Sequence, residues 1–180
     1  MCGILIEVDS RNSVCRENFE KALDTLYHRG PDGRGSIYAW NDSVALGHRR
    51  LSIIDLSERG KQPMANEDGA IHVTYNGEIY NYTELRDQLK DKHTFFSHTD
   101  TETLVHGYEE WGMEGLLQRL NGMFAFAILD MKKRRLFLAR DRAGIKPIYY
   151  EHGQGRFAAA SEPKALNALK STPLKLTFRR

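Results

Sequence analysis

The chain begins MCGILIEV (residues 1–8), a short apolar run that directly follows a cysteine. The run predicts a buried β-strand over 3–8, because a short apolar stretch bounded by polar residues is typical of a core strand. Removal of Met1 would make Cys2 the chain terminus, so that one residue carried both a thiol and an α-amine. A thiolate is a strong nucleophile, and an α-amine, with an ordinary pKa of about 7.7–8.0, can act as its general base. The competing interpretation is that Cys2 is a small apolar residue at a strand start.

Beyond this strand, the sequence predicts runs of strands with the helices grouped between them. Helices are expected at 16–27, 82–90, 101–111 and 162–169, and further strands at 35–40, 43–50, 70–75, 123–130, 135–140, 147–151 and 156–160. Thr99 and Glu102 have the spacing of a capping box at the start of the third helix. This order indicates an α+β fold. Two packed antiparallel sheets covered by helices would bury such strands, although the pattern alone does not decide against a single sheet.

The composition fits one ordinary domain of 180 residues and excludes several classes of protein. The formal net charge of +2 gives no electrostatic footprint for nucleic acid. No apolar stretch approaches the ~18 residues of a membrane-spanning helix, and the N-terminus lacks the basic leader of a signal peptide, so we expect a cytoplasmic protein. The two cysteines and seven histidines lack the spacing of a disulfide framework or a metal site, so no bound metal is expected.

Two polar segments would complete a pocket around the cysteine. Asn76 and Gly77 follow the expected strand 70–75, and they predict either a tight turn or an oxyanion hole made of a side-chain amide and a backbone N–H. Arg49 and Arg50 end the strand 43–50. Because neighbouring strand residues face opposite sides, only one of these arginines can hold a carboxylate inside a pocket.

A third segment contributes a carboxylate. Asp100, just before the expected helix 101–111, is either a capping or first-turn acid favoured by the helix dipole or the partner of a substrate ammonium group. Together with a nucleophilic cysteine, an arginine and an Asn-Gly pair, it describes a pocket for a free amino acid whose side chain ends in an amide.

Six segments then carry a family resemblance: MCGI (1–4), HRGPD (28–32), GHRRLSI (47–53), NGEIYN (76–81), GMFAFA (122–127) and ARDRAGIKP (139–147). In this order they resemble the N-terminal glutaminase domain of glutamine-hydrolysing asparagine synthetases of the bacterial type, a class II glutamine amidotransferase. The resemblance covers residues 1 to about 168. It implies the N-terminal-nucleophile (Ntn) hydrolase fold, a four-layer αββα sandwich of two antiparallel sheets.

The resemblance also implies residue roles. Cys2 would attack the side-chain amide of L-glutamine, release ammonia and form a thioester that water hydrolyses, while its own amine moved the protons. Arg50 is selected for the substrate carboxylate and Asp100 for the α-ammonium group, with Asn76 and Gly77 as the oxyanion hole. Supporting roles fall on backbone groups of Leu51 and Ile53, on Glu78 in the pocket lining, and on Arg29 beside the cysteine.

Members of this family have a second, C-terminal domain whose motifs do not occur among these 180 residues. This ATP-dependent synthetase domain has a Ser-Gly-Gly type phosphate-binding loop, and neither that loop nor a Walker-type loop occurs here. We therefore expect a glutaminase domain over 1–170 and a tail or linker start over 171–180. No cofactor is expected in this chain; ATP and Mg²⁺ would belong to a synthetase domain or subunit, the partner that receives the ammonia. The resemblance also makes a homodimer of the full-length protein possible.

Three alternatives stay open. The ammonia acceptor is either aspartate or another carboxylate, because the same branch includes enzymes of sugar-acid and antibiotic pathways. The substrate of an N-terminal-cysteine hydrolase could be a different amide, although Arg50 and Asp100 favour a free amino acid. A non-catalytic module would need a retained Met1 or a disrupted Asn-Gly pair.

Overall fold

A computed structural model describes residues 1–170 and places two antiparallel sheets face to face. The five-stranded sheet has the order β2 (Gly33–Ala39), β3 (Val44–Arg50), β1 (Gly3–Asp9), β9 (Arg156–Ala160) and β8 (Tyr149–Gly153). The four-stranded sheet has the order β4 (Met64–Ala65), β5 (Ile71–Ile79), β6 (Gly122–Asp130) and β7 (Arg135–Arg140). The tail predicted at 171–180 lies outside the described residues.

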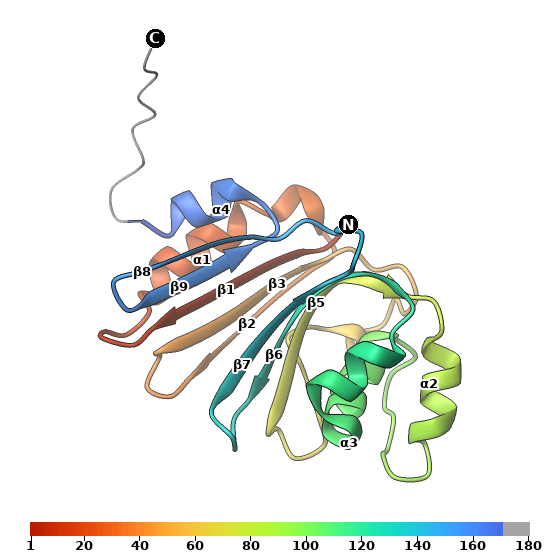
Figure 1. Cartoon of the computed structure of the whole chain (residues 1–180). Helices are drawn as coiled ribbons and strands as arrows, with labels where there is room; N and C mark the ends of the chain where they lie inside the picture. The colour runs from red at the N-terminus through yellow and green to blue at the C-terminus, as the bar shows by residue number, and fades with distance from the viewer. Residues whose placement is uncertain (171–180) are drawn as a thin grey trace.

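Helices cover the outer face of each sheet (Figure 1). The first pair, α1 (Arg16–Asp24) and α4 (Pro163–Ala168), packs on the five-stranded sheet, and the second pair, α2 (Tyr82–Leu89) and α3 (Thr101–Arg119), lies on the side of the four-stranded sheet. Single 3₁₀ turns occur at Tyr27–Arg29 and Glu58–Gly60. The predicted α+β class, with two sheets between two helical layers, is therefore confirmed.

The apolar residues of the first strand, β1, are continuous because both of its faces are buried. Leu5 faces α1 and packs with Phe19 and Leu23, whereas Ile4 and Ile6 face the opposite sheet and pack with residues of β6 such as Ala127. Alternate strand residues point to opposite faces, so a strand covered on both sides must be apolar throughout. Burial of each of these large side chains contributes about 1.5–3 kcal/mol.

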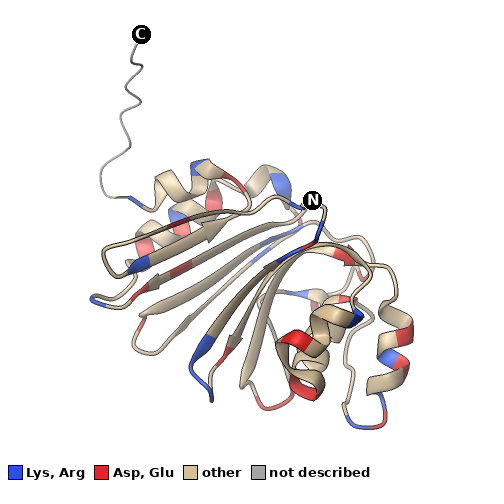
Figure 2. Ribbon diagram, in the orientation of Figure 1, with Lys and Arg blue, Asp and Glu red and all other residues tan. Residues whose placement is uncertain are grey.

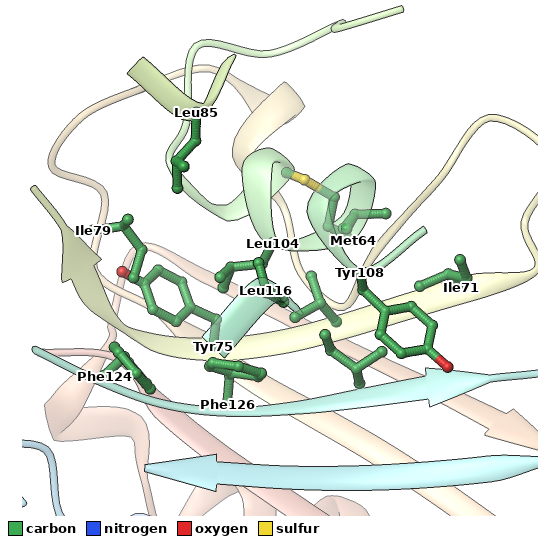
Figure 3. Close-up of a cluster of buried hydrophobic side chains, with 13 residues drawn as sticks. Met64, Ile71, Tyr75, Ile79, Leu85, Leu104, Tyr108, Leu116, Phe124 and Phe126 are labelled. Carbon is green, nitrogen blue, oxygen red and sulfur yellow. The ribbon is translucent and has the colours of Figure 1, made fainter. Parts of the chain in front are cut away.

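A third apolar cluster joins the four-stranded sheet to its helices. Figure 3 shows Tyr75, Phe124 and Phe126 on the strands, opposite Leu104 and Leu116 of α3. Charged residues lie mainly on the outer helices and at the ends of strands and loops, while most of the strand surface is uncharged (Figure 2). None of the helices within residues 1–170 has the length and apolar character needed to cross a membrane.

Of the two interpretations of Asn76 and Gly77, the tight turn after residue 75 is wrong. Strand β5 continues to Ile79, and Asn76 and Gly77 pair with Ala125 and Phe124 of β6. A Cβ on Gly77 would lie 2.4 Å from the carbonyl oxygen of Met123. The glycine is therefore required by the close approach of β6 and not by a turn.

The capping box predicted from Thr99 and Glu102 is also wrong. Asp100 is the N-cap residue of α3, and no side chain caps this helix. The Glu102 carboxylate is fully buried and accepts hydrogen bonds from the backbone N–H groups of Phe96 and Ser97, both at 2.8 Å. The carboxylate thus provides hydrogen-bond acceptors for backbone N–H groups of the loop before the helix. The helix is also longer than expected, with a break at Gly112, where φ is 66°.

Candidate active site

A cavity of about 120 Å³ lies beside the start of β1 and the ends of β3 and β5. The N-terminus marks this end of the sandwich in Figure 1. All the predicted site residues except Arg29 line it: Cys2, Arg50, Leu51, Ile53, Asn76, Gly77, Glu78 and Asp100. Cys2 directly precedes β1, Arg50 ends β3, and Leu51 and Ile53 follow β3, so these four belong to the five-stranded sheet or adjoin it. The others come from β5 and the start of α3. The cavity therefore exists only when the two sheets are packed together.

The thiol of Cys2 is held by the chain that leaves β3. Its Sγ lies 3.4 Å from the backbone nitrogen of Leu51 and 3.7 Å from the carbonyl oxygen of the same residue. Arg29 holds the backbone of the cysteine from the other side: its Nε donates to the Cys2 carbonyl at 2.9 Å, and its Nη1 donates to Glu162 at 2.9 Å. Arg29 thus holds the backbone of Cys2 without lining the cavity.

Burial raises the pKa of the Cys2 thiol. The Leu51 N–H, the positive chain terminus on Met1 and the Arg50 guanidinium oppose this shift, whereas the Asp100 carboxylate adds to it. Met1 is half exposed at the cavity and its sulfur lies 3.5 Å from Nζ of Lys146. Loss of Met1 would move the positive amine onto Cys2 itself, next to the thiol.

The two arginines of β3 face opposite sides, as strand geometry requires. Arg49 points outward and pairs with Asp24 of α1. Arg50 is 9% exposed and donates from Nη1 to the Ser57 carbonyl at 2.7 Å and from Nη2 to the Asp55 carbonyl. A guanidinium carries five N–H donors, so after these two bonds it retains donors for an anion in the cavity.

Asn76 and Gly77 face the cavity from β5. The amide nitrogen Nδ2 of Asn76 is buried and has no hydrogen-bond partner among residues 1–170. A buried donor without an acceptor costs about 1–3 kcal/mol, so an acceptor arriving in the cavity would recover that free energy. The structure thus places a free donor in the same cavity as a thiol.

Asp100 lies deep in the site, 5% exposed. Its Oδ2 accepts hydrogen bonds from the hydroxyl of Tyr75 at 2.7 Å and from the backbone nitrogen of Ile79 at 2.9 Å. Burial raises the pKa of this carboxyl, and the Tyr75 and Ile79 hydrogen bonds oppose the shift. Asp100 occupies the N-cap position of α3 without a capping hydrogen bond, and its Oδ2 is bound to β5 instead.

The remaining predicted residues sit at the cavity mouth. Ile53 is 72% exposed and Glu78 is exposed as well, whereas Leu51 is half-buried beside the thiol. The placement fits backbone contacts by Leu51 and Ile53, and it gives Glu78 access to a bound molecule.

Several residues that shape the site were missed from the sequence. Tyr75 holds Asp100, and Gln62 accepts a hydrogen bond from the Tyr75 backbone nitrogen at 2.7 Å. Gly60 lies so close to Arg50 that a Cβ there would overlap the guanidinium. Lys146 also lines the cavity, and in the sequence it stands out only as part of the segment ARDRAGIKP. The loop residues Gly60 and Gln62 carried no local signal, because their role depends on contacts across the fold.

The arrangement combines a nucleophile, a free amide donor, a cation and an anion in one small cavity. Arg50 and Asp100 can bind the carboxylate and ammonium groups of one amino acid. The thiol can attack a carbonyl carbon, and Asn76 can donate to the oxygen that becomes negative.

The sequence matches known proteins over nearly its whole length. Residues 1–178 match the family described as the glutamine amidotransferase domain. The chain is 42% identical over 184 residues to the amidase chry2 of Gibberella zeae, and the aligned region covers 96% of this chain and 27% of that protein. It is 41% identical over 174 residues to the asparagine synthetase (glutamine-hydrolyzing) 3 of Bacillus subtilis, covering 93% of this chain and 28% of that protein. The chain thus spans about a quarter of the length of these relatives.

The fold matches solved structures equally well. Glutamine phosphoribosylpyrophosphate amidotransferase from B. subtilis superimposes with a TM-score of 0.80 at 22% sequence identity, over 96% of this chain and 44% of that chain. The allosteric regulatory enzyme of purine biosynthesis gives a TM-score of 0.79 at 22% identity, over 97% of this chain and 44% of that chain. This likeness shows that the sandwich is shared.

The charges around the thiol predict opposite effects of two substitutions in protein that retains Met1. Asp100→Asn should lower the pKa of Cys2, because it removes a nearby negative charge, and Arg50→Gln should raise it, because it removes a positive one. The measurement is the pH dependence of alkylation at Cys2, followed by peptide mass spectrometry, with the exposed Cys15 of the same sample as the internal control. Shifts of the same sign in both variants would contradict this account of the site.

Proposed function

The chain belongs to the glutamine amidotransferase domain family, and on this basis we propose that it hydrolyses L-glutamine to glutamate and ammonia through a thioester on Cys2. After removal of Met1, the free amine of Cys2 takes the thiol proton. The thiolate attacks the side-chain amide carbon, and the amine returns the proton to the leaving nitrogen, so that ammonia departs. Water then attacks the thioester with the same amine as base and releases glutamate.

The observation that carries this proposal is the unpartnered Nδ2 of Asn76 in the cavity of Cys2. Its donor suits the oxygen that becomes negative when the tetrahedral intermediate forms, and the backbone N–H of Gly77 is proposed as a second donor. Preorganised donors of this kind contribute roughly 10²–10³ to kcat. In the ground state the amide oxygen is a weaker acceptor, so the same donors favour the transition state.

Arg50 and Asp100 support a free amino acid as the substrate. We assign the α-carboxylate of glutamine to the guanidinium of Arg50 and its α-ammonium group to Asp100, with Leu51, Ile53 and Glu78 as further contacts. An acylated amine or an amidated carboxylate would leave one of these two buried charges without a partner, which is costly. The pocket therefore argues against the hydrolysis of a different amide.

We further propose that the ammonia serves an ATP-dependent amidation of aspartate in a synthetase domain or subunit. Support comes from relatives named glutamine-hydrolyzing asparagine synthetases, which are 40–41% identical to this chain in B. subtilis and Methanocaldococcus jannaschii. ATP, Mg²⁺, a homodimer and a cytoplasmic location belong to this same proposal. Relatives named amidases match equally well, so an acceptor other than aspartate is the second candidate.

Cys2→Ala should abolish glutaminase activity and leave the fold intact, because the residue contributes the nucleophile and only a small part of the core. Ammonia release from glutamine by the purified chain is the measurement, and circular dichroism checks the fold. Cys15→Ala, which removes an exposed thiol, is the matched control and should keep full activity. Residual activity above roughly a thousandth of wild type would rule out Cys2 as the nucleophile.

Two substitutions should affect different kinetic constants, one mainly KM and the other mainly kcat. Asp100→Ala should raise KM for glutamine by at least about 30-fold with a smaller effect on kcat, because its partner is present before and during the reaction. Asn76→Ala should lower kcat by roughly 10²–10³ with little change in KM. Steady-state kinetics with glutamine tests both. A kcat effect alone at Asp100, or a KM effect alone at Asn76, would contradict the assigned roles.

The acceptor is tested with the polypeptide from the complete reading frame that contains these residues. With ATP, Mg²⁺ and aspartate, it should form asparagine from glutamine, and Cys2→Ala should abolish this reaction while asparagine formation from added ammonium chloride continues. The 180-residue chain alone should release ammonia and glutamate but form no asparagine. Amidation of another carboxylate in place of aspartate would support the second candidate, and asparagine formation by the 180-residue chain would contradict the assigned boundaries.

A further inference from the structure

A second group of titratable side chains lies away from the cysteine. His106 and Glu109 come from α3, His93 from the loop between α2 and α3, and Glu67 from the loop between β4 and β5. One donor atom from each of the four lies within 4.8 Å of the other three. Three separate segments of the chain therefore direct two imidazoles and two carboxylates at one point.

The donor atoms face one another at distances too long for direct hydrogen bonds. Nδ1 of His106 lies 3.6 Å from Oε2 of Glu67 and 3.9 Å from Oε2 of Glu109. Nδ1 of His93 lies 3.6 Å from the same Glu109 oxygen and 3.9 Å from Oε1 of Glu67. A contact of 3.6 Å is beyond hydrogen-bond length. Donors bound to one tetrahedral Zn²⁺ at 2.0–2.2 Å would be roughly 3.3–3.6 Å apart. The two contacts of 3.6 Å match this spacing, and the wider pairs would have to close by a few tenths of an ångström to about 1 Å around an ion.

The histidine at the centre is buried without a partner. The His106 side chain is fully buried, and neither of its ring nitrogens has a hydrogen-bond partner within the described part of the chain. Buried polar groups are nearly always satisfied, and an exception calls for a ligand or an ion. Because Nδ1 points at two carboxylates, a cation is the species that would satisfy all three groups at once.

The carboxylates are already oriented for such a role. Glu67 uses Oε1 to accept the Thr94 backbone N–H at 3.0 Å, and Glu109 uses Oε1 to accept Nδ2 of Asn66 at 3.1 Å. Each therefore keeps Oε2 directed at His106. Both glutamates are about one-third to two-fifths exposed, which gives an ion a path from solvent.

The outer nitrogens of both imidazoles also face carboxylates. Nε2 of His106 lies 3.6 Å from Oε1 of the buried Glu102, and Nε2 of His93 lies 4.0 Å from Oε2 of Glu110. A metal-binding histidine commonly directs its other ring nitrogen to a carboxylate, which fixes the tautomer that leaves the first nitrogen free for the metal.

We propose that Glu67, His93, His106 and Glu109 bind one divalent transition-metal ion of the Zn²⁺ class. Two imidazole and two carboxylate donors suit such an ion better than Ca²⁺ or Mg²⁺, which prefer oxygen ligands. With all four positions filled by protein, the site is structural. The expectation from the sequence was that no metal binds. The sequence does not reveal this cluster, because the four side chains come from three segments and form no compact motif.

The proposed ion would fix the segment that presents Asp100. His93 precedes this residue by seven positions and His106 follows it by six. A metal between them would tie the loop 90–100 to the first turns of α3 and to the loop before β5. Independently of the glutaminase proposal, the site should therefore raise the thermal stability of the domain.

The test is metal binding by tag-free protein in a Cys2→Ala/Cys15→Ala background, which excludes binding by thiols. After removal of metal with a chelator, equilibrium dialysis measures the Zn²⁺ bound per chain, and the visible spectrum of the Co²⁺ form reports four-coordinate geometry. Glu67→Gln, Glu109→Gln and His93→Asn are the ligand variants. Glu114→Gln and His152→Asn, which alter exposed residues outside the cluster, are the matched controls.

We expect one Zn²⁺ per chain, a tetrahedral Co²⁺ spectrum and a rise in Tm of about 5–10 °C at a hundredfold excess of free Zn²⁺ over Kd. Each ligand variant should weaken binding by more than about 100-fold, because loss of an outer partner alone costs 10–100-fold. The controls should bind like the background protein. Substoichiometric Zn²⁺, or equal binding by the ligand variants and the background, would overturn the proposal and leave the cluster as an imidazolium–carboxylate group.

Discussion

The site depends on two hydrogen bonds that join the sheets in the interior of the sandwich. Nε2 of His48 on β3 lies 3.0 Å from the carbonyl oxygen of Tyr75 on β5, and the hydroxyl of Thr74 donates to the Gly47 carbonyl at 3.1 Å. Apolar packing between sheets is non-directional, so it does not by itself fix how one sheet is displaced along the other. These two bonds do. Burial holds the pKa of His48 at about 4, so the ring stays neutral and donates at any physiological pH.

With this register fixed, each half of the chemistry can come from a different sheet. The residues next to the bonded pair Gly47–His48 lead to Arg50 and the Cys2 contact at Leu51, and those next to Thr74–Tyr75 lead to Asn76. A shift of one residue in either strand would exchange the buried and exposed faces. It would direct Arg49 inward and turn Asn76 toward the helices. The position of an amide donor near a thiol is therefore a property of strand pairing and sheet packing together.

The sequence sufficed for features that follow from local periodicity and from the chain terminus. The apolar run after Cys2 predicted β1, and the alternation of strand residues predicted that only one of Arg49 and Arg50 would face the cavity. It failed where a residue serves a distant partner. The turn interpretation of Asn76-Gly77 was wrong because the close approach of β6 to Gly77 has no local signature. Glu102 was taken for a helix cap because a four-residue spacing does not reveal the loop N–H groups that donate to its carboxylate.

The loops that complete the cavity are not held by strand pairing. Their backbone N–H groups donate hydrogen bonds to side-chain carboxylates instead. Asp55 accepts from the Ser57 hydroxyl and from the backbone nitrogens of Ser57 and His98, which lower the pKa of this carboxyl to about 2. The Glu102 carboxylate likewise accepts hydrogen bonds from the backbone N–H groups of Phe96 and Ser97. Each carboxylate thus joins a loop to its neighbour and stays charged near neutral pH, because the accepted bonds favour the ionised form. Asp100 differs, since burial raises its pKa, and its charge would be fully stabilised only by a cation in the cavity. Asp100 is therefore the acid of this cavity whose charge a bound cation would stabilise further, beyond the hydrogen bonds from Tyr75 and Ile79.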